Sequence, residues 1–155
     1  NKMNYLCVGH DFGVINMRSQ AYITEACQPW NLSYSEYVTL MTLYDFDGSS
    51  QSELCNEMKA DKALVARSLK TLEEKGYVCR RQKDGDRRFK FIYLTPKARD
   101  IQGELAGVLE TWITYLVEGF DETKRDEMLA MLHAIAERAE EADIRAVKEK
   151  GEMTR

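Results

Sequence analysis

The apolar positions of residues 61–95 change their spacing midway, from helical to alternating. The first half begins with a capping aspartate, places apolar residues on one helical face and ends at a glycine suited to the left-handed conformation: Asp61, Val65, Leu69, Leu72 and Gly76. The second half has two β-favouring runs, 77–79 and 89–94, on either side of a polar Asp-Gly turn. These spacings predict a helix followed by a basic β-hairpin, which is the pattern of a winged helix.

Further helices are predicted upstream of this stretch. Over residues 5–26 apolar side chains recur at steps of three and four, which predicts a long amphipathic helix that ends before Pro29. Two capping-box pairs open the next two helices: Ser33 with Glu36, and Ser50 with Glu53. The short helix after the second pair, a tight turn at Ala60 and the helix from Lys62 together predict a helix-turn-helix.

Two long helices are predicted downstream of the hairpin. Thr95 and Pro96 mark a helix start, because a proline at the first helical position gives up no needed donor. One helical apolar stripe continues from there to Gly119, and Asp121 caps a last helix. Beyond Glu140 the apolar signal thins, so we expect the final residues to be frayed.

These elements predict a mainly α fold with a small β-hairpin wing, that is, a winged helix-turn-helix with a helical dimerisation region. The amphipathic helices at both ends carry more apolar surface than one small lobe can cover, which indicates a two-fold interface. The expected division is a dimerisation helix at 1–31, a DNA-binding domain at 32–95, dimerisation helices at 96–146 and a frayed tail at 147–155.

Charge is spread unevenly along the chain, although the formal net charge is only −4. From Lys59 to Arg99 there are 13 Lys and Arg against 5 Asp and Glu, a local net charge of +8, and the rest of the chain carries −12. A clustered basic patch is typical of a surface that binds phosphates. We therefore predict double-stranded DNA as the partner of this segment, with the acidic remainder facing away from it.

Composition argues against several other classes of protein. With 155 residues, 44% of them hydrophobic, and no apolar run near the roughly 18 residues of a membrane span, we expect one domain with neither a membrane anchor nor a signal peptide. Four cysteines lie scattered without a C-x-x-C pair, which indicates a reducing cytoplasm: Cys7, Cys27, Cys55 and Cys79. His10 and His133 are too far apart in sequence to suggest a zinc site or a catalytic set, so we expect no metal, no cofactor and no enzyme.

The order of these elements and their motifs resembles the MarR family of bacterial transcription regulators. The matching motifs are the run LEEKGYV from Leu72 to Val78, the Asp-Arg-Arg signature at 86–88, and the strand that ends in Leu94 and Thr95. One departure, Pro-Lys-Ala at 96–98, affects only a helix start. The resemblance covers most of the chain, and it implies an obligate homodimer whose two recognition helices bind a pseudo-palindromic operator.

The resemblance also implies roles for individual residues of the helix and the wing. Arg67 matches the arginine that contacts base edges, Arg88 the wing arginine that enters the minor groove, and Asp86 the acid that braces the wing. Arginine suits both grooves, because it donates two hydrogen bonds to guanine and is attracted to a narrow minor groove. We expect two alanines to keep the helix slim and five polar residues to contact the DNA backbone: Ala63 and Ala66, then Lys62, Ser68, Lys70, Lys83 and Arg87.

The family commonly binds small aromatic or phenolic ligands, which implies a repressor that such a ligand releases from its operator. Five residues are candidates for that crevice, with ordinary core packing as the alternative: Trp30, Tyr37, Met41, Tyr44 and Trp112. Some relatives sense peroxides through a cysteine of the first helix, which makes Cys7 a candidate redox site; burial as core filler is the alternative. The remaining alternative is a winged-helix module used for protein contacts.

Overall fold

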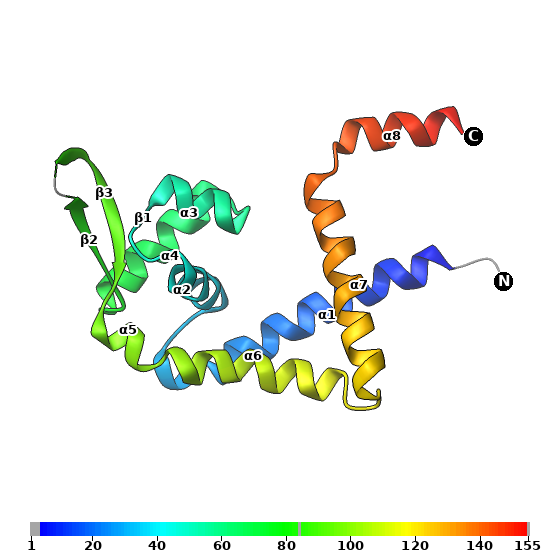
Figure 1. Ribbon diagram of the computed structural model, residues 1–155, viewed down its shortest axis with the longest axis horizontal. Coiled ribbons are helices and arrows are strands. Elements are labelled where there is room, and N and C mark those ends of the chain that lie inside the picture. The colour runs from blue at the N-terminus through cyan, green and yellow to red at the C-terminus, as the bar shows by residue number, and fades with distance from the viewer. Residues whose placement is uncertain (1–3, 84, 155) are drawn as a thin grey trace. The chain divides into compact units, whose positions relative to one another are not determined.

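The computed structural model describes residues 4–83 and 85–154, and the side chains of Asp86 and Arg87 lie outside its described part. The chain divides into two compact units, Asn1–Ile113 and Thr114–Arg155. The elements of the first unit are α1 (Tyr5–Ala26), η1 (Gln28–Trp30), α2 (Tyr34–Asp45), β1 (Ser49–Ser50), α3 (Gln51–Met58), α4 (Lys62–Glu74), β2 (Val78–Lys83), β3 (Asp86–Leu94), α5 (Pro96–Asp100) and most of α6 (Gln102–Leu116). The second unit contains the end of α6, α7 (Glu122–Glu141) and α8 (Ile144–Met153) (Figure 1).

Local capping sets where the helices begin. The hydroxyl of Ser33 accepts from the amide of Glu36, whose carboxylate accepts in turn from the amide of Ser33, so the predicted capping box of α2 is confirmed. Ser50 and Glu53 form the same reciprocal pair at α3. Thr95 caps α5, with proline at the first helical position as the sequence predicts.

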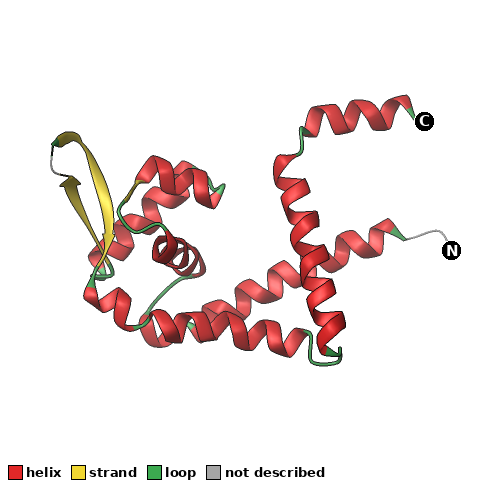
Figure 2. Ribbon diagram, viewed as in Figure 1, coloured by secondary structure: helices red, strands yellow, loops and turns green. Residues whose placement is uncertain are grey.

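A small antiparallel sheet lies beside the helices, and helices dominate the fold as predicted (Figure 2). Its strand order is β1-β3-β2, so β3 is central and pairs with the two-residue strand β1 through Ser49 and Ile92. The sequence does not predict β1, because a strand of two residues is too short to show an alternating apolar pattern. Gly48, at φ +82, leads into it; a Cβ at this glycine would lie 3.0 Å from the ring of Tyr93.

The core of the first unit joins the apolar faces of these elements. Its largest fully buried side chains come from α2, α3, α4, β3 and α6: Leu40, Leu43, Leu54, Leu69, Leu72, Ile92 and Leu105. The helical stripe predicted for residues 65–72 is therefore the buried face of α4, and its opposite face is left to solvent.

Two boundaries near the C-terminal end differ from the sequence prediction. The single helix expected after Pro96 is interrupted at Ile101, which separates α5 from α6. The hydroxyl of Tyr44 donates to the carbonyl of Ala98 at 2.5 Å, so this carbonyl at the end of α5 has a partner outside the helix. The frayed end expected for residues 147–155 is wrong over the described residues, since α8 forms there behind a cap by Asp143.

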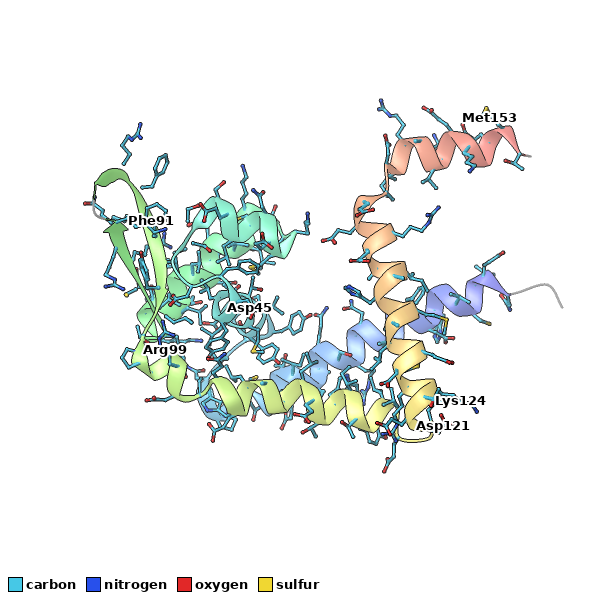
Figure 3. The ribbon with its side chains drawn as sticks, in the orientation of Figure 1. Asp45, Phe91, Arg99, Asp121, Lys124 and Met153 are labelled. Carbon is cyan, nitrogen blue, oxygen red and sulfur yellow. The ribbon has the colours of Figure 1, made fainter. Side chains whose placement is uncertain are left out.

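In the second unit, the turn between α6 and α7 is held by an arginine. Asp121 caps α7 by accepting from the amide of Lys124 (Figure 3). The guanidinium of Arg125 donates to the carbonyls of Val117 and Phe120, at 3.1 and 2.8 Å, and thereby satisfies free carbonyls after α6. Among the described helices none is long and apolar enough to cross a bilayer.

Candidate nucleic-acid interface

The solvent face of α4 carries the cations that the sequence predicts for DNA contact. Asp61 caps the helix by accepting from the amides of Ala63 and Leu64 at 2.8 and 3.1 Å. The predicted contact residues that are exposed on this helix, or half-buried in the case of Ala66, are Lys62, Ala63, Ala66, Arg67 and Lys70. Small side chains beside the cations keep this face slim, which favours entry into a major groove about 12 Å wide.

Ser68 is not part of that face. It is only 3% exposed, and its carbonyl accepts from the hydroxyl of Thr71. The position follows Arg67 by one residue, which turns it about 100° around the helix and toward the core. The expectation that Ser68 contacts the DNA backbone is therefore corrected.

The wing follows α4 through a left-handed glycine. Gly76 has φ +82, and the amide of Tyr77 donates back to the carbonyl of Leu72 at 2.9 Å, which closes the helix as the sequence predicts. At the hairpin tip Gly85 has φ +84. Arg88 and Lys83 are exposed near this tip, and the ammonium of Lys83 lies 4.1 Å from the centre of the Phe91 ring. The predicted roles of Asp86 and Arg87 fall on side chains outside the described part.

Arg80 joins the wing to both helices of the helix-turn-helix, a role that the sequence analysis does not assign. Its Nη1 donates to the Gln51 side chain at 3.3 Å, and its Nε lies 3.7 Å from the carboxylate of Glu73. These contacts connect β2 to the start of α3 and the end of α4. The only sequence signal was the basic pair Arg80-Arg81, which does not indicate which of the two faces inward.

A buried ion pair fixes the end of α4 against the start of α2. The ammonium of Lys75 donates to the Glu36 carboxylate at 2.7 Å and to the carbonyl of Asn31 at 2.6 Å. Burial raises the pKa of Glu36, but the hydrogen bonds from Lys75, from the amide of Ser33 and from the hydroxyls of Thr71 and Ser33 outweigh it and hold this pKa below its usual value. Lys97 donates to the carbonyl of Lys75 at 2.6 Å, so α5 is tied to the same point.

The five candidate ligand residues serve packing and internal hydrogen bonds in this structure. The hydroxyls of Tyr37 and Tyr44 donate to the carbonyls of Leu105 and Ala98, and burial raises the pKa of each phenol to about 12. Trp30 and Met41 are half-buried and pack against the core.

Trp112 contacts side chains of α1. Its ring stacks on Tyr22 with centroids 4.8 Å apart, and its Nε1 donates to Ser19 at 2.7 Å. This stack joins α1 to α6. Tyr37 is only 3% exposed, so the structure does not leave it open to a ligand. Trp30, Met41, Tyr44 and Trp112 are half-buried, and only their exposed parts remain open to one.

The cysteines differ in exposure. Cys7 is exposed on α1, whereas Cys27 and Cys55 are buried and Cys79 is half-buried. Burial raises the pKa of the Cys27 thiol, which disfavours its reactive thiolate. Within residues 4–83 and 85–154, no three His, Cys, Asp or Glu side chains gather in a way that could hold a metal ion.

Comparison with known proteins agrees with this geometry. Residues 32–90 match the model of the MarR family. The chain is 24% identical over 114 residues to the HTH-type transcriptional regulator BilQ of Clostridioides difficile, covering 74% of this chain and 77% of that protein. It is 43% identical over 76 residues to the uncharacterized HTH-type transcriptional regulator YdgJ of Bacillus subtilis, covering 49% of this chain and only 45% of that protein.

Solved structures share the fold across most of the chain. A MarR transcriptional regulator from Methanosarcina mazei Go1 is 26% identical, with a TM-score of 0.82 over 88% of this chain and 92% of that one. A putative MarR family regulator from Listeria monocytogenes, crystallised with 26mer DNA, is 21% identical, with a TM-score of 0.76 over 83% and 86%. With its capped recognition-type helix, its wing and these matches, residues 32–90 form a MarR family domain within a fold that MarR regulators share.

Proposed function

We propose that this protein is a dimeric, sequence-specific regulator of transcription that binds double-stranded DNA through α4 and the wing. The observation that carries the proposal is the exposed cationic face of α4, with Arg67 and Lys70, beside a wing that exposes Arg88 near its tip. The Listeria monocytogenes neighbour, which has the same fold, was crystallised with DNA. A DNA-binding role would place the protein in the cytoplasm, with the chromosome.

Arg67 and Arg88 would have different tasks. An arginine in the major groove donates two hydrogen bonds to one guanine and specifies a base, whereas an arginine in the minor groove responds to groove width and potential. Lys62, Lys70 and Lys83 would contact phosphates, which fixes register without specifying sequence.

The proposal is tested by selecting bound duplexes from random DNA and titrating the protein on the recovered sequence at rising salt. Arg67→Ala should cost about 1–3 kcal/mol per half-site and relax the preference at one base pair. Arg88→Ala should weaken binding most where A·T-rich flanks are present, and Lys83→Ala should weaken all sequences alike and reduce the salt slope by about one. Equal, sequence-independent losses for all three variants, or no DNA binding at micromolar protein, would contradict the proposal and favour a protein-contact module.

The dimer is supported by apolar side chains that the chain leaves uncovered. On α1 they include Tyr5, Leu6, Phe12, Ile15 and Met17, of which Leu6 is 87% exposed. On α7 they include Leu129, Met131, Leu132 and Ile135. Large apolar side chains left exposed on a helix in such numbers favour an interface with a second copy of the chain. Sedimentation at micromolar concentration should give a dimer, and a monomer would remove the two-fold symmetry on which a palindromic operator depends.

The regulator would act as a repressor that a small aromatic or phenolic ligand releases from DNA. Support comes from the partly exposed aromatic edges at α1, α2 and α6, above all the stacked pair of Tyr22 and Trp112. A panel of phenols and aromatic carboxylates should contain a compound that releases the selected duplex and changes tryptophan fluorescence. Release without any fluorescence change, or no release by the panel, would count against this ligand class.

A thiol-based response through Cys7 is the second candidate for regulation, because Cys7 is the exposed cysteine on α1. Peroxide should then weaken binding of the selected duplex, and Cys7→Ser should abolish the effect. Cys27→Ser serves as the buried control. Equal peroxide sensitivity of the Cys7→Ser variant and the parent protein would exclude this response.

A further inference from the structure

One face of the wing combines cations with aromatic rings. The register pairs Cys79 with Tyr93 and Arg81 with Phe91, so these side chains share a face, while Val78, Arg80, Ile92 and Leu94 occupy the other. The second face is buried against the lobe at Val78, Ile92 and Leu94. The first face lies on the opposite side of the sheet, with Arg81 exposed, Cys79 and Tyr93 half-buried and Phe91 only 8% exposed, and we call it the outer face of the wing.

The cations of the outer face are held over its rings. The guanidinium carbon of Arg81 lies 4.2 Å from the centre of the Tyr93 ring, and the ammonium of Lys83 lies 4.1 Å from that of Phe91. Tyr93 itself packs closely on the turn before β1, because Gly48 has no Cβ and a Cβ there would lie 3.0 Å from the ring. A cation stacked in this way keeps its N–H groups available at the ring edge and has already lost part of its side-chain freedom.

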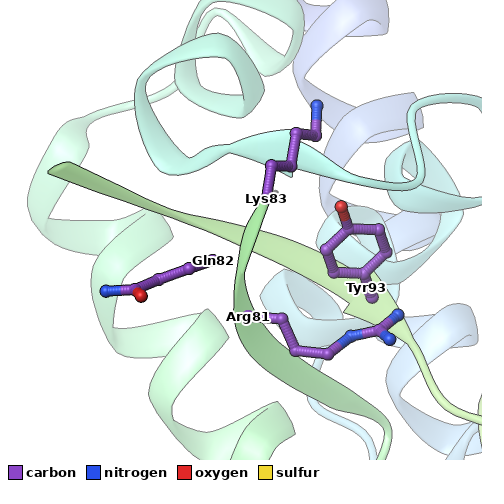
Figure 4. Close-up of a pocket in the computed structure, with 4 residues that line it drawn as sticks. All are labelled: Arg81, Gln82, Lys83 and Tyr93. Carbon is purple, nitrogen blue, oxygen red and sulfur yellow. The ribbon is translucent and has the colours of Figure 1, made fainter. Parts of the chain in front are cut away.

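A hollow of about 460 Å³ opens between these groups, lined by Arg81, Gln82, Lys83 and Tyr93. In Figure 4 the side chain of Arg81 extends toward Tyr93, while that of Gln82 points to the other side of the strand. The hollow thus presents a guanidinium, an ammonium and a phenol hydroxyl, and none of the described residues that line it is acidic. Such a set of donors is chemically suited to an anion with several oxygen atoms.

We propose that this hollow binds a backbone phosphate of the DNA strand that runs along the outer face of the wing; the proposal rests on the DNA-binding function above. A minor groove is about 6 Å wide, so a hairpin that enters it has a sugar-phosphate backbone on each side. The outer face meets one of these strands. Arg81 and Lys83 stand two residues apart on β2, with a register shift between Gln82 and Lys83, and together with Tyr93 extend the contact from the tip toward the base of the wing.

The test uses the duplex recovered by selection, with one phosphate at a time replaced by a neutral methylphosphonate along the flank next to the wing. Arg81→Gln should weaken binding about tenfold and lower the salt slope by about one. One or two neutral linkages, on one strand, should weaken the parent protein but have little further effect on Arg81→Gln. This non-additivity identifies the phosphate that Arg81 contacts.

Lys90→Gln is the matched control. Lys90 pairs with Gln82 on the opposite face of the hairpin, so this substitution removes the same charge from that face. In this variant, the neutral linkage that is non-additive with Arg81→Gln should weaken binding as much as it does in the parent protein. Tyr93→Leu is the second variant, since it removes the ring but keeps an apolar residue on Gly48; it should give a smaller loss at that same linkage. The affinities are compared only among variants whose melting temperature equals that of the parent protein.

Two results would overturn the proposal. One is parent-like affinity of Arg81→Gln on the selected duplex. The other is full additivity of Arg81→Gln with every neutral linkage, which would make Arg81 a general source of positive charge. In either case salt-dependent binding by the parent protein would leave the proposed DNA-binding function intact, whereas absence of binding by the parent would remove that function itself.

Discussion

Replacing Lys75 by methionine should destabilise the protein by leaving a carboxylate buried without its cation. Glu36 is only 3% exposed, and its main partner is the Lys75 ammonium at 2.7 Å. Removal of one member of a buried pair costs about 3–5 kcal/mol. Because the Lys75 side chain is itself 27% exposed, water screens the pair, and we expect a loss at or below the bottom of that range, about 2–3 kcal/mol. Methionine keeps the length of the aliphatic stem, so little of this loss comes from packing.

The loss depends on pH in a defined direction. In the parent protein the pKa of Glu36 lies below its usual value, so the pair contributes stability above the unfolded pKa and loses it as pH falls through the folded pKa. In Lys75→Met the main lowering contact is gone and burial raises the pKa, so the penalty is present at neutral pH and vanishes as the carboxyl is protonated. The difference between the two proteins should therefore shrink from pH 7 to pH 4.

The assay is urea unfolding followed by circular dichroism, at one fixed protein concentration because a dimer's stability depends on it. A loss of 2–3 kcal/mol moves the midpoint by about 1 M urea. The control is the double variant Glu36→Gln with Lys75→Met, in which glutamine keeps the capping box and no charge is buried. It should be more stable than Lys75→Met alone. Neutral surface changes alter the free energy of unfolding by up to about 0.5 kcal/mol. If Lys75→Met differs from the parent by no more than that, or if its loss does not depend on pH, the buried-pair reasoning is refuted.

Three further predictions follow from the local geometry. Gly76→Ala should cost about 1–2 kcal/mol in thermal or urea unfolding, because φ is +82 there and an added Cβ meets only open space and a flexible side chain; an unchanged midpoint would contradict the backbone argument. Asp61→Ala should cost about 1 kcal/mol through the lost cap, and Asp61→Asn, which keeps an acceptor, should recover most of it. Double-mutant cycles with Arg80→Gln are measured by the anisotropy of labelled DNA. Arg80→Gln should reduce the loss of DNA affinity caused by Arg88→Ala and leave the loss caused by Arg67→Ala unchanged. Additive losses in both cycles would mean that Arg80 does not position the wing.

Short-range signals in the sequence determined most of the element boundaries. Ser33 with Glu36 and Ser50 with Glu53 predicted the starts of α2 and α3, and Gly76 predicted the end of α4. Each of these signals acts within one helical turn, between groups that are neighbours in the chain whatever the rest of the molecule does. The same holds for the apolar stripe of α4, whose spacing alone predicted which of its sides is buried.

The weaker local signals failed at the C-terminal end. The segment Ile144–Met153 has few apolar residues, which is why the sequence predicts a frayed end at 147–155, and that prediction takes no account of the cap by Asp143. Exposed helices of this kind depend on capping and propensity rather than on a buried face, so a hydrophobic pattern under-predicts them.

Only the tertiary structure decided which side chains of the candidate interface meet. Arg80 finds Gln51 and Glu73, Lys75 finds Glu36, and the break after α5 coincides with a bond from Tyr44 to a carbonyl 54 positions away. Strand β1 exists only because β3 supplies its partner. Sequence order states which residues are basic or aromatic, but pairing across tens of residues depends on how the elements pack, and a basic pair such as Arg80-Arg81 divides between two faces only when the sheet register is set.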